Sequence, residues 1–187
     1  MKKLREADYQ SMPWKNGGGV TTQLAVFPSS AGIDDFAWRI SMAQVSTSGA
    51  FSPFPGVDRS LAVVDGTGLH LRMAGSVPVQ IDRTSPVMAF AGETPIDATL
   101  VDGPVTDFNV MSRRTAWTHS MERLQLDGSV MLDGADEVFL YCAHGQACIG
   151  ETSIAAHEAV QTGPCRQLQL RSDASSLLYL VRLHRRK

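Results

Sequence analysis

The sequence predicts an all-β protein made of two related halves, and three observations carry this prediction. Short runs of β-branched and aromatic residues, bounded by glycine and proline, recur along the chain and are typical of strands joined by tight turns. No segment shows the apolar spacing over about 12 residues that a stable amphipathic helix needs. Strand and turn signals also repeat in the same order after about 70 to 80 residues. Together these observations favour two antiparallel barrels or sandwiches.

In the first half, strand signals begin behind a run of three glycines and continue to a pair of arginines. In the segment 36–45, alternation places Trp38 on one face of the strand and Arg39 and Ser41 on the other. The tetrapeptide Asp-Gly-Thr-Gly at 65–68 predicts a hairpin between its two neighbouring strands. The strands expected in this half are 20–27, 36–45, 60–64, 69–73, 77–81, 87–90, 96–100 and 108–111.

The second half restarts the pattern after about residue 118. The run 61–71 matches 138–149 as strand, polar glycine turn and strand, and each half closes with an apolar strand and two arginines. We therefore expect an N-terminal barrel over about 1–117 and a C-terminal barrel over about 118–187. The strands expected in the second half are 138–142, 147–149, 153–160, 167–170 and 177–183.

The composition is that of an ordinary globular protein and argues against several classes. With 187 residues, 43% of them apolar, the chain can fill one large core or two smaller ones. A net charge of −2 does not indicate the basic surface that general nucleic-acid binding needs. No stretch approaches the roughly 20 apolar residues of a membrane helix, and the N-terminus lacks the apolar core of a secretory signal. Three cysteines without a disulfide pattern fit a reducing cytoplasm.

The stretch MPWKNGGGVTTQL places three glycines directly behind Trp14, Lys15 and Asn16. A Walker loop needs its lysine after the glycines, and both it and a dinucleotide fingerprint open a helix, whereas here a strand follows. The glycines instead predict a tight turn. Trp14, Lys15 and exposed backbone N–H groups of the turn could clasp a small anion. The alternative for Lys15, the only lysine away from the termini, is a solvated surface charge.

Polar residues alternate with apolar ones in two further strands. Arg39 and Ser41 form a polar site if they point into a barrel, and they are ordinary solvent residues if they point outward. Asp107 and Asn109 also share a face. Those two side chains either orient a ligand or hydrogen-bond the backbone of a loop.

The segment 49–59, GAFSPFPGVDR, reads as an ordered loop despite its two prolines and two glycines. Phe51 and Phe54 give this loop apolar anchors. At its end, Asp58 and Arg59 suggest an internal ion pair at the base of the loop.

Histidines and cysteines lack the spacing of a metal site. His70 has no second histidine two positions on, and Cys142, His144 and Cys148 form neither a C-x-x-C nor an H-x-H pattern. A buried free cysteine beside an exposed histidine is the favoured interpretation. A nucleophilic pair of Cys142 and His144 is the alternative, but no orienting third group is evident. We expect no metal and no cofactor.

The sequence closely resembles the HutD/Ves family in three stretches, MPWKNGGGVTTQLAVFP, FAWRISMAQVSTSGAFSPFPGVDRSLAVVDGTGLHL and DFNVMSRR. The match runs over about 12–114 and is specific, because several long motifs occur in the family's order. The second half matches mainly in its pattern of β-elements. The resemblance implies a bicupin, a chain of two cupin-like antiparallel β-barrels of the RmlC-like jelly-roll type, with strands exchanged between the halves.

The resemblance also implies a function. Family members occur in bacteria, often encoded beside histidine-utilisation genes, and they resemble small-molecule-binding regulators that moderate histidine catabolism. The implied ligand is a carboxylate intermediate such as urocanate or a formylated or formiminated glutamate. From the composition, we expect a cytoplasmic protein that binds neither nucleic acid nor membrane. A second copy of the chain is a candidate partner in a homodimer.

Motif positions of the family carry over to this chain residue by residue. Lys15 and Arg39 would bind a ligand carboxylate, Ser41 and Asn109 would orient its polar groups, and a tryptophan would wall the pocket. Gly19, Phe51, Phe54 and Gly56 are further motif positions outside the candidate ligand set. The candidate ligand-binding residues are Trp14, Lys15, Asn16, Gly17, Gly18, Thr21, Trp38, Arg39, Ser41, Asp58, Arg59, Asp107, Asn109 and Arg113.

Two alternative functions belong to other classes. One is a metal-independent cupin enzyme acting on a small carboxylate, with Asp58 or Asp107 as the base. Gln23 stands where relatives commonly carry a glutamate, so it cannot supply that base. The other alternative is a module that binds a transcription regulator or a pathway enzyme.

Overall fold

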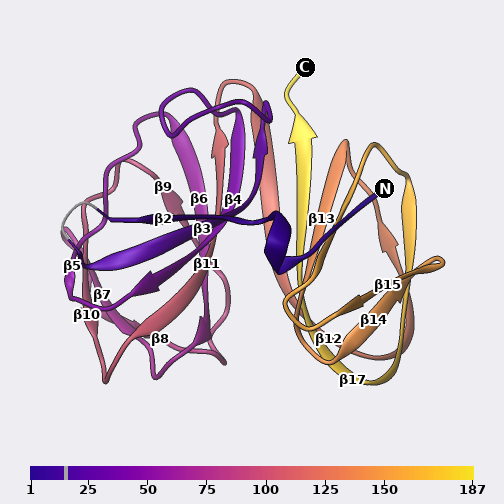
Figure 1. Cartoon of the computed structure of the whole chain (residues 1–187). Helices are drawn as coiled ribbons and strands as arrows, with labels where there is room; N and C mark the ends of the chain where they lie inside the picture. Colours follow the sequence, from indigo (N-terminus) through magenta and orange to yellow (C-terminus); the bar gives the residue numbers. More distant parts are fainter. Residues whose placement is uncertain (15–16) are drawn as a thin grey trace. The chain divides into compact units, whose positions relative to one another are not determined.

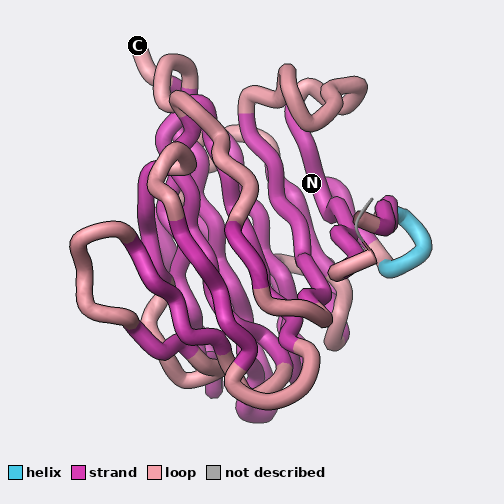
Figure 2. Tube along the Cα trace, turned by 90° about the vertical axis from the view of Figure 1, so that its left-hand side faces the viewer, coloured by secondary structure: helices cyan, strands magenta, loops and turns pink. Residues whose placement is uncertain are grey.

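The computed structural model describes residues 1–14 and 17–187. Strands and turns make up almost all of these residues, which confirms the predicted all-β class. The one helical element in the described ranges is the 3₁₀ turn η1 (Glu6–Asp8), drawn in cyan beside the magenta strands in Figure 2. Within the described part of the chain, no helix has the length and apolarity to cross a membrane.

Contacts divide the chain into two compact units. Unit 1 consists of Met1–Tyr9 and Trp117–Lys187, and unit 2 consists of Gln10–Ala116. The upper limit of unit 2 lies close to the boundary expected from the sequence repeat. The first nine residues differ from that expectation, because they pack with the C-terminal half of the chain rather than with residues 10–116.

Unit 2 contains two antiparallel sheets, whose strands run in colour from indigo through magenta to rose in Figure 1. The first sheet has the order β2 (Gln10–Pro13), β3 (Gly19–Phe27), β4 (Trp38–Val45), β11 (Val105–Arg113), β6 (Val57–Asp65) and β9 (Met88–Ala91). The second sheet has the order β5 (Gly49–Ala50), β10 (Ile96–Leu100), β7 (Leu69–Met73) and β8 (Val79–Ile81).

The two sheets of unit 2 pack face to face through alternating apolar side chains. Leu61 and Val63 of β6 join Leu69 and Leu71 of β7 in one buried cluster. Because side chains of a strand alternate between its faces, every second residue of β6 and its neighbours points into this space. The inner face of the first sheet is therefore the face that carries Leu61 and Val63.

The segment Asp65–Gly68 forms a turn, but the predicted hairpin is wrong. β6 ends at Asp65 and β7 begins at Leu69, yet β6 pairs with β11 and β9, whereas β7 pairs with β10 and β8. The chain thus crosses from one sheet to the other here. Gly66 and Gly68 have positive φ angles of 93° and 133°, which other residues rarely adopt.

Unit 1 is built around two long strands, β12 (Trp117–Asp133) and β17 (Gln167–Arg185), which pair along most of their length. Its remaining strands are β1 (Lys2–Leu4), β13 (Glu137–His144), β14 (Gln146–Ile149), β15 (Thr152–Ala155) and β16 (Ala159–Thr162). β1 pairs with β16, although it opens the chain.

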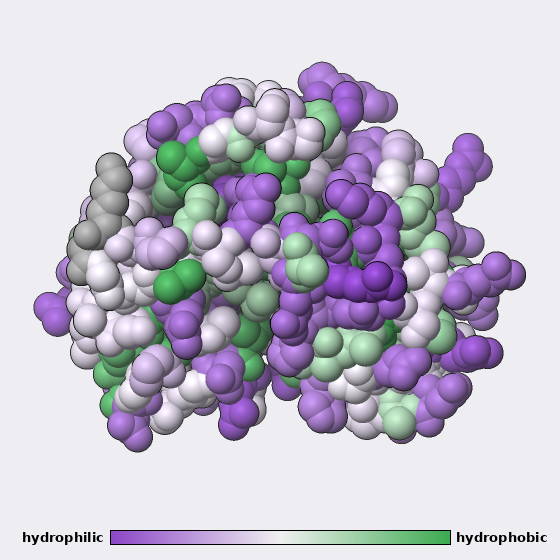
Figure 3. Space-filling model, viewed as in Figure 1, coloured by the Kyte–Doolittle hydropathy of each residue, from purple (hydrophilic) through white to green (hydrophobic). Residues whose placement is uncertain are grey.

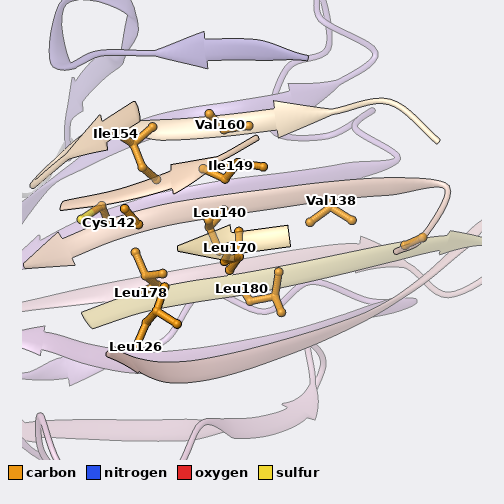
Figure 4. Close-up of a cluster of buried hydrophobic side chains, with 12 residues drawn as sticks. Leu126, Val138, Leu140, Cys142, Ile149, Ile154, Val160, Leu170, Leu178 and Leu180 are labelled. Carbon is orange, nitrogen blue, oxygen red and sulfur yellow. The ribbon is translucent and has the colours of Figure 1, made fainter. Parts of the chain in front are cut away.

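The core of unit 1 is a cluster of aliphatic side chains from the strands β12 to β17. Leu140 and Leu180 face each other across β13 and β17, and Ile149, Val160 and Leu170 extend the cluster into neighbouring strands (Figure 4). Burial of such side chains contributes about 1.5 to 3 kcal/mol each. This unit therefore has a hydrophobic core of its own.

Hydrophilic and hydrophobic side chains alternate on the face shown in Figure 3, where green areas are small and interrupted. The large apolar side chains exposed in the described residues are spread over both units and include Met12, Val77 and Met131. Isolated exposed apolar residues are normal on a protein surface.

Candidate functional site

The glycine run forms the tight turn that the sequence predicts. Trp14 N–H donates to the carbonyl of Gly19 (2.9 Å), and Gly17 N–H donates to the carbonyl of Trp14 (3.0 Å). These bonds close the turn between β2 and β3, and a strand follows it rather than a helix. Lys15 and Asn16 lie outside the described residues, so their candidate roles stay predictions.

Trp14 lies over the beginning of β3. Its Nε1 donates a hydrogen bond to Thr21 Oγ1 at 2.7 Å. A Cβ added to Gly19 would lie 3.2 Å from the indole ring and would collide with the carbonyl oxygen of Gln44. Gly19 therefore allows both the indole and the neighbouring strand β4 to approach the backbone closely. Gly18 also helps to fix this turn, because its carbonyl accepts a hydrogen bond from Ser46 N–H (2.9 Å).

Polar side chains gather on the inner face of the first sheet of unit 2. Ser41 pairs with Asn109 in the register of β4 and β11, and Arg39 and Arg59 flank Met111 from the two neighbouring strands. Directly opposed residues of antiparallel strands point to the same face. We call this group the polar cluster, and its members are Gln23, Arg39, Ser41, Arg59, Asp107 and Asn109.

The polar cluster lies between two apolar clusters on the same face. Along β11, Val105 belongs to the apolar cluster that joins the two sheets, whereas Met111 packs with Phe36 and Val57. Asp107 and Asn109 occupy the two inward positions between them. Apart from the half-buried Gln23, side chains of the polar cluster are at most 8% exposed.

Arg59 is enclosed by aromatic rings. Its guanidinium carbon lies 5.4 Å from the ring centre of Phe51, 5.5 Å from that of Phe54 and 5.0 Å from that of Phe90. Its Nη1 also donates to the carbonyl of Ser52 (3.4 Å). Ring faces attract a cation and attract it more strongly where water is excluded. The predicted loop anchors Phe51 and Phe54 are thus also part of a cage around Arg59.

Charge and burial perturb the titration of this group of side chains. Burial raises the pKa of Asp107 to about 7, and the positive charge of Arg59 acts against that rise. Burial lowers the pKa of Arg59 to about 10, while Asp107 raises that pKa and Arg39 lowers it. Burial lowers the pKa of Arg39 as well. Arg59 is therefore electrostatically coupled both to Asp107 and to Arg39.

Three buried atoms of the polar cluster have no hydrogen-bond partner among the described residues. They are Nε of Arg59, Oδ1 of Asp107 and Oδ1 of Asn109. An unsatisfied buried polar atom costs about 1 to 3 kcal/mol, or more when the group is charged. A partner from outside the chain, either water or a ligand, would remove this cost.

Apart from Trp14, Gly17, Gly18 and Thr21 at the glycine turn and the start of β3, three described candidate residues lie outside the polar cluster. Trp38 alternates with Arg39 and stacks on Phe27 at a centroid distance of 5.9 Å. Arg113 donates from Nε to the carbonyl of Phe36 (2.9 Å) and from Nη2 to that of Asp34, so it holds the loop before β4.

Asp58 is the third, and the suggested ion pair between Asp58 and Arg59 is wrong. Successive residues of β6 point to opposite faces. Arg114 Nε donates to Asp58 Oδ1 at 2.8 Å, and Arg114 also pairs with Glu93 (3.0 Å). Asp58 therefore belongs to a partly exposed ion-pair network.

Four contributors were not in the candidate ligand set: the motif residues Phe51 and Phe54 of the Arg59 cage, and also Gln23 and Phe90. Gln23 Oε1 accepts a hydrogen bond from Arg39 Nε at 2.9 Å, and Phe90 supplies the third ring of the Arg59 cage. Gln23 stands two residues from Thr21 in an alternating strand, which could have indicated it. For Phe90 no such signal exists, because its contact depends on the pairing of β9 with β6.

The described residues contain no group of three or more His, Cys, Asp or Glu side chains placed to hold a metal ion. Cys142 is buried, and its Sγ donates to the carbonyls of His144 and Gly145, both at 3.5 Å. Burial raises the pKa of the Cys142 thiol to about 11. A thiol that remains protonated is a poor nucleophile, which argues against the Cys142 and His144 pair.

A surface recess of unit 2 lies at the turns that follow β6 and β8. It is lined by Asp65, Gly66, Thr67, Asp82, Arg83 and Thr84, none of which belongs to the polar cluster. Asp82 Oδ1 is already engaged by Thr84 and Ser85. We therefore base the candidate site on the polar cluster rather than on this recess.

Comparison with solved structures shows that proteins of very different sequence share this β fold. The pirin YhhW from Escherichia coli superposes with a TM-score of 0.72 over 96% of this chain and 97% of its own, at 10% identity. A mutant of Bacillus subtilis oxalate decarboxylase OxdC superposes with a TM-score of 0.67 over 97% of this chain and 76% of its own, at 5% identity. At such low identities these likenesses concern the fold alone.

The chain belongs to the HutD family, whose family model HutD matches residues 6–180. It is 35% identical over 87% of its length to a 21.2-kDa protein encoded in the hutC 3′ region of Pseudomonas putida, of which the match covers 83%. It is also 36% identical over 57% of its length to protein Ves of Escherichia fergusonii, of which the match covers 56%.

Two solved structures are similar over the whole chain. HutD from Pseudomonas fluorescens SBW25, in a formate condition, has a TM-score of 0.88 and 25% identity, with 100% of this chain and 99% of that chain covered. A conserved protein of unknown function from Pseudomonas aeruginosa PAO1 has a TM-score of 0.86 and 29% identity, with 98% of each chain covered. The expected family resemblance is thereby confirmed.

Proposed function

We propose that this protein is a cytoplasmic small-molecule-binding regulator that moderates histidine utilisation. Its ligand is a small carboxylate of that pathway, of the urocanate or formyl- and formiminoglutamate class, and the polar cluster of unit 2 is the binding site. The genomic setting of the Pseudomonas putida relative, beside hutC, supports the connection to the pathway. Urocanate and formylglutamate share the carboxylate that such a site would recognise.

The observation that carries the proposal is the charge of the polar cluster. Two buried arginines, Arg39 and Arg59, share the inner face with a single buried carboxyl group, that of Asp107. A buried charge is costly unless an opposite charge accompanies it. Arginine also offers a planar fork that matches a carboxylate. A ligand carboxylate would supply the missing negative charge.

The proposed architecture is a bicupin. Each unit is one cupin-like barrel, and β1 is the strand that the N-terminal part of the chain contributes to unit 1. The pairing of β1 with β16 and the cupin-like structural neighbours support this view. A second copy of the chain remains our candidate for a protein partner.

A thermal-shift screen with histidine, urocanate and N-formyl-L-glutamate tests the proposed function. A ligand at 100 times its Kd stabilises the folded state by about 2.7 kcal/mol. We expect Arg39→Met to lose this stabilisation, whereas Arg72→Met, which changes an exposed arginine of β7, keeps it. Absence of a shift with every compound would refute the proposal.

Lys15 supplies a second, independent test of the pocket. If Lys15 binds the ligand carboxylate from the rim of the barrel, Lys15→Ala abolishes the ligand-induced stabilisation and leaves the melting temperature of the free protein unchanged. Retained binding in this variant would remove Lys15 from the site.

An enzyme is the second candidate function, and Asp107 favours it. A buried carboxyl group with a pKa of about 7 and an unpartnered Oδ1 is suited to general acid–base catalysis near neutral pH. Asp58, the other candidate base, is already paired with Arg114. Turnover assays on urocanate and N-formyl-L-glutamate decide between the two functions, because Asp107→Asn should abolish any turnover that uses this base.

A further inference from the structure

Within the polar cluster, Arg39 has a neutral partner. Its Nε donates to the amide oxygen Oε1 of Gln23 at 2.9 Å. In the described part of the chain this is the hydrogen bond that the Arg39 side chain makes, so its two terminal nitrogens stay available. Because Arg39 is only 5% exposed, bulk water solvates its charge poorly.

The charged groups that face this space can be followed strand by strand. β4 contributes Arg39, β6 contributes Arg59 and β11 contributes Asp107. The inward residues of the facing sheet are apolar, as Leu71 and Ile96 illustrate. Among the described residues, the buried face therefore carries one positive charge in excess when Asp107 is ionised, and two when it is protonated.

We propose that Gln23 determines the charge specificity of the site, by orienting Arg39 without neutralising it. An inner-facing glutamate at this position would place a carboxylate oxygen where the amide oxygen now accepts the hydrogen bond. That carboxylate would satisfy Arg39 internally. The glutamine instead leaves the terminal nitrogens of Arg39 to an anionic ligand group, so the site selects anions over neutral molecules of the same shape. This inference rests on the proposed function of the polar cluster.

The matched pair of acetate and acetamide tests charge selection directly, because the two probes differ in charge at nearly the same size. We expect acetate, and any pathway carboxylate found in the screen, to stabilise the wild-type protein, whereas acetamide leaves its melting temperature unchanged. Equal stabilisation by acetate and acetamide would overturn the inference while leaving a small-molecule site in place.

Three variants test the role of Gln23. Gln23→Glu adds one negative charge beside Arg39, and we expect it to weaken carboxylate binding about tenfold or more, since close charge pairs at interfaces have coupling energies above 1.4 kcal/mol. Gln23→Met removes the acceptor but keeps the charge excess, so its loss should be smaller. Gln44→Glu adds the same charge at an exposed position of β4, and we expect binding to remain at the wild-type level.

The ligand-free proteins separate failure of the inference from failure of the proposed function. Without ligand, Gln23→Glu should unfold at the same or a higher temperature than the wild type, because it supplies a counter-charge to Arg39. Carboxylate binding in the wild type with unchanged affinity in Gln23→Glu would overturn the inference alone. Absence of carboxylate binding in the wild type would overturn both the inference and the proposed function. A lower melting temperature of ligand-free Gln23→Glu would overturn the inference, because it would show that Arg39 already has a counter-charge.

Discussion

Asp107 places an ionisable carboxyl group where almost no water reaches it, since its side chain is 2% exposed. Its pKa rises from the ordinary value of 3.8 to about 7, because burial disfavours the charged form more than Arg59 stabilises it. In the unfolded chain the carboxyl group regains its ordinary pKa. The difference between the two states makes stability depend on pH.

The sign of this dependence follows from proton uptake. Between about pH 4 and pH 7 the folded protein keeps a proton on Asp107 that the unfolded chain has released, so this group's contribution to the free energy of unfolding falls as pH rises. We expect Asp107→Asn to remove that contribution. Urea unfolding of both proteins from pH 4.5 to pH 8 measures this contribution. The free energy of unfolding of the wild type minus that of the variant should decrease as pH rises to about 7. Parallel curves would contradict the assigned pKa.

At the level of residues, strand alternation could predict much of the candidate site. It placed Arg39 with Ser41 and Asp107 with Asn109, and the structure brings both pairs to one buried face. Alternation could not show that β6 adds Arg59 beside them, because that depends on long-range pairing. Whether these residues bind a ligand stays a prediction.

Among the elements, β3 requires glycine, a residue without a side chain, at its first position. Gly19 is buried, and a Cβ there would meet the backbone of β4 and the indole of Trp14. Backbone atoms cannot move aside as the end of a flexible side chain can. The close approach of β4 and that of Trp14 therefore both require glycine at this position.

Gly19→Ala should lower the free energy of unfolding by about 1 to 3 kcal/mol, the range typical of overpacking. The matched control is Gly49→Ala in β5, where an added Cβ meets no atom within 4 Å. Chemical denaturation of the two variants measures the difference. A stability loss in Gly49→Ala equal to that in Gly19→Ala would show that loss of glycine itself, rather than crowding, is responsible.

The strands were predictable where their apolar residues alternate, and less so elsewhere. Positions 36–45 and 96–100 show clear alternation and contain β4 and β10. β12 was not predicted, because exposed polar residues such as Glu122 and Arg123 interrupt its pattern. The turn at 65–68 was located correctly, but turn residues specify a reversal of the chain and not the partner of each strand.

Considered as a whole, the molecule has a unit that is assembled from both ends of the described chain. Leu4 of β1 is 3% exposed and pairs with Ala159 of β16. Lys3 reinforces this attachment, because its Nζ contacts Glu158 at 2.6 Å and the carbonyl of Ser153 at 2.8 Å. The sequence repeat could indicate two β-rich halves, but three residues at the start of the chain are too few to indicate their partner.

Leu4→Ala should therefore destabilise unit 1 by about 2 to 5 kcal/mol, as expected when a buried leucine is truncated. Lys2→Ala, at an exposed position of the same strand, should have little effect. Hydrogen exchange resolves the location of the change, and protection should fall in β16 and β13 of the Leu4 variant. Unchanged protection there would show that β1 contributes little to unit 1.

The attachment of β1 also has a consequence for the order of events during synthesis. Lys2 pairs with Gln161, so β1 leaves the ribosome long before the strand with which it pairs. Residues 10–116 are contiguous and can gather into unit 2 in the meantime, since domains generally fold as units during translation. Until β16 is synthesised, Leu4 lacks its native partner strand in unit 1. The pairing of β1 in unit 1 is thus completed only after β16 has been synthesised.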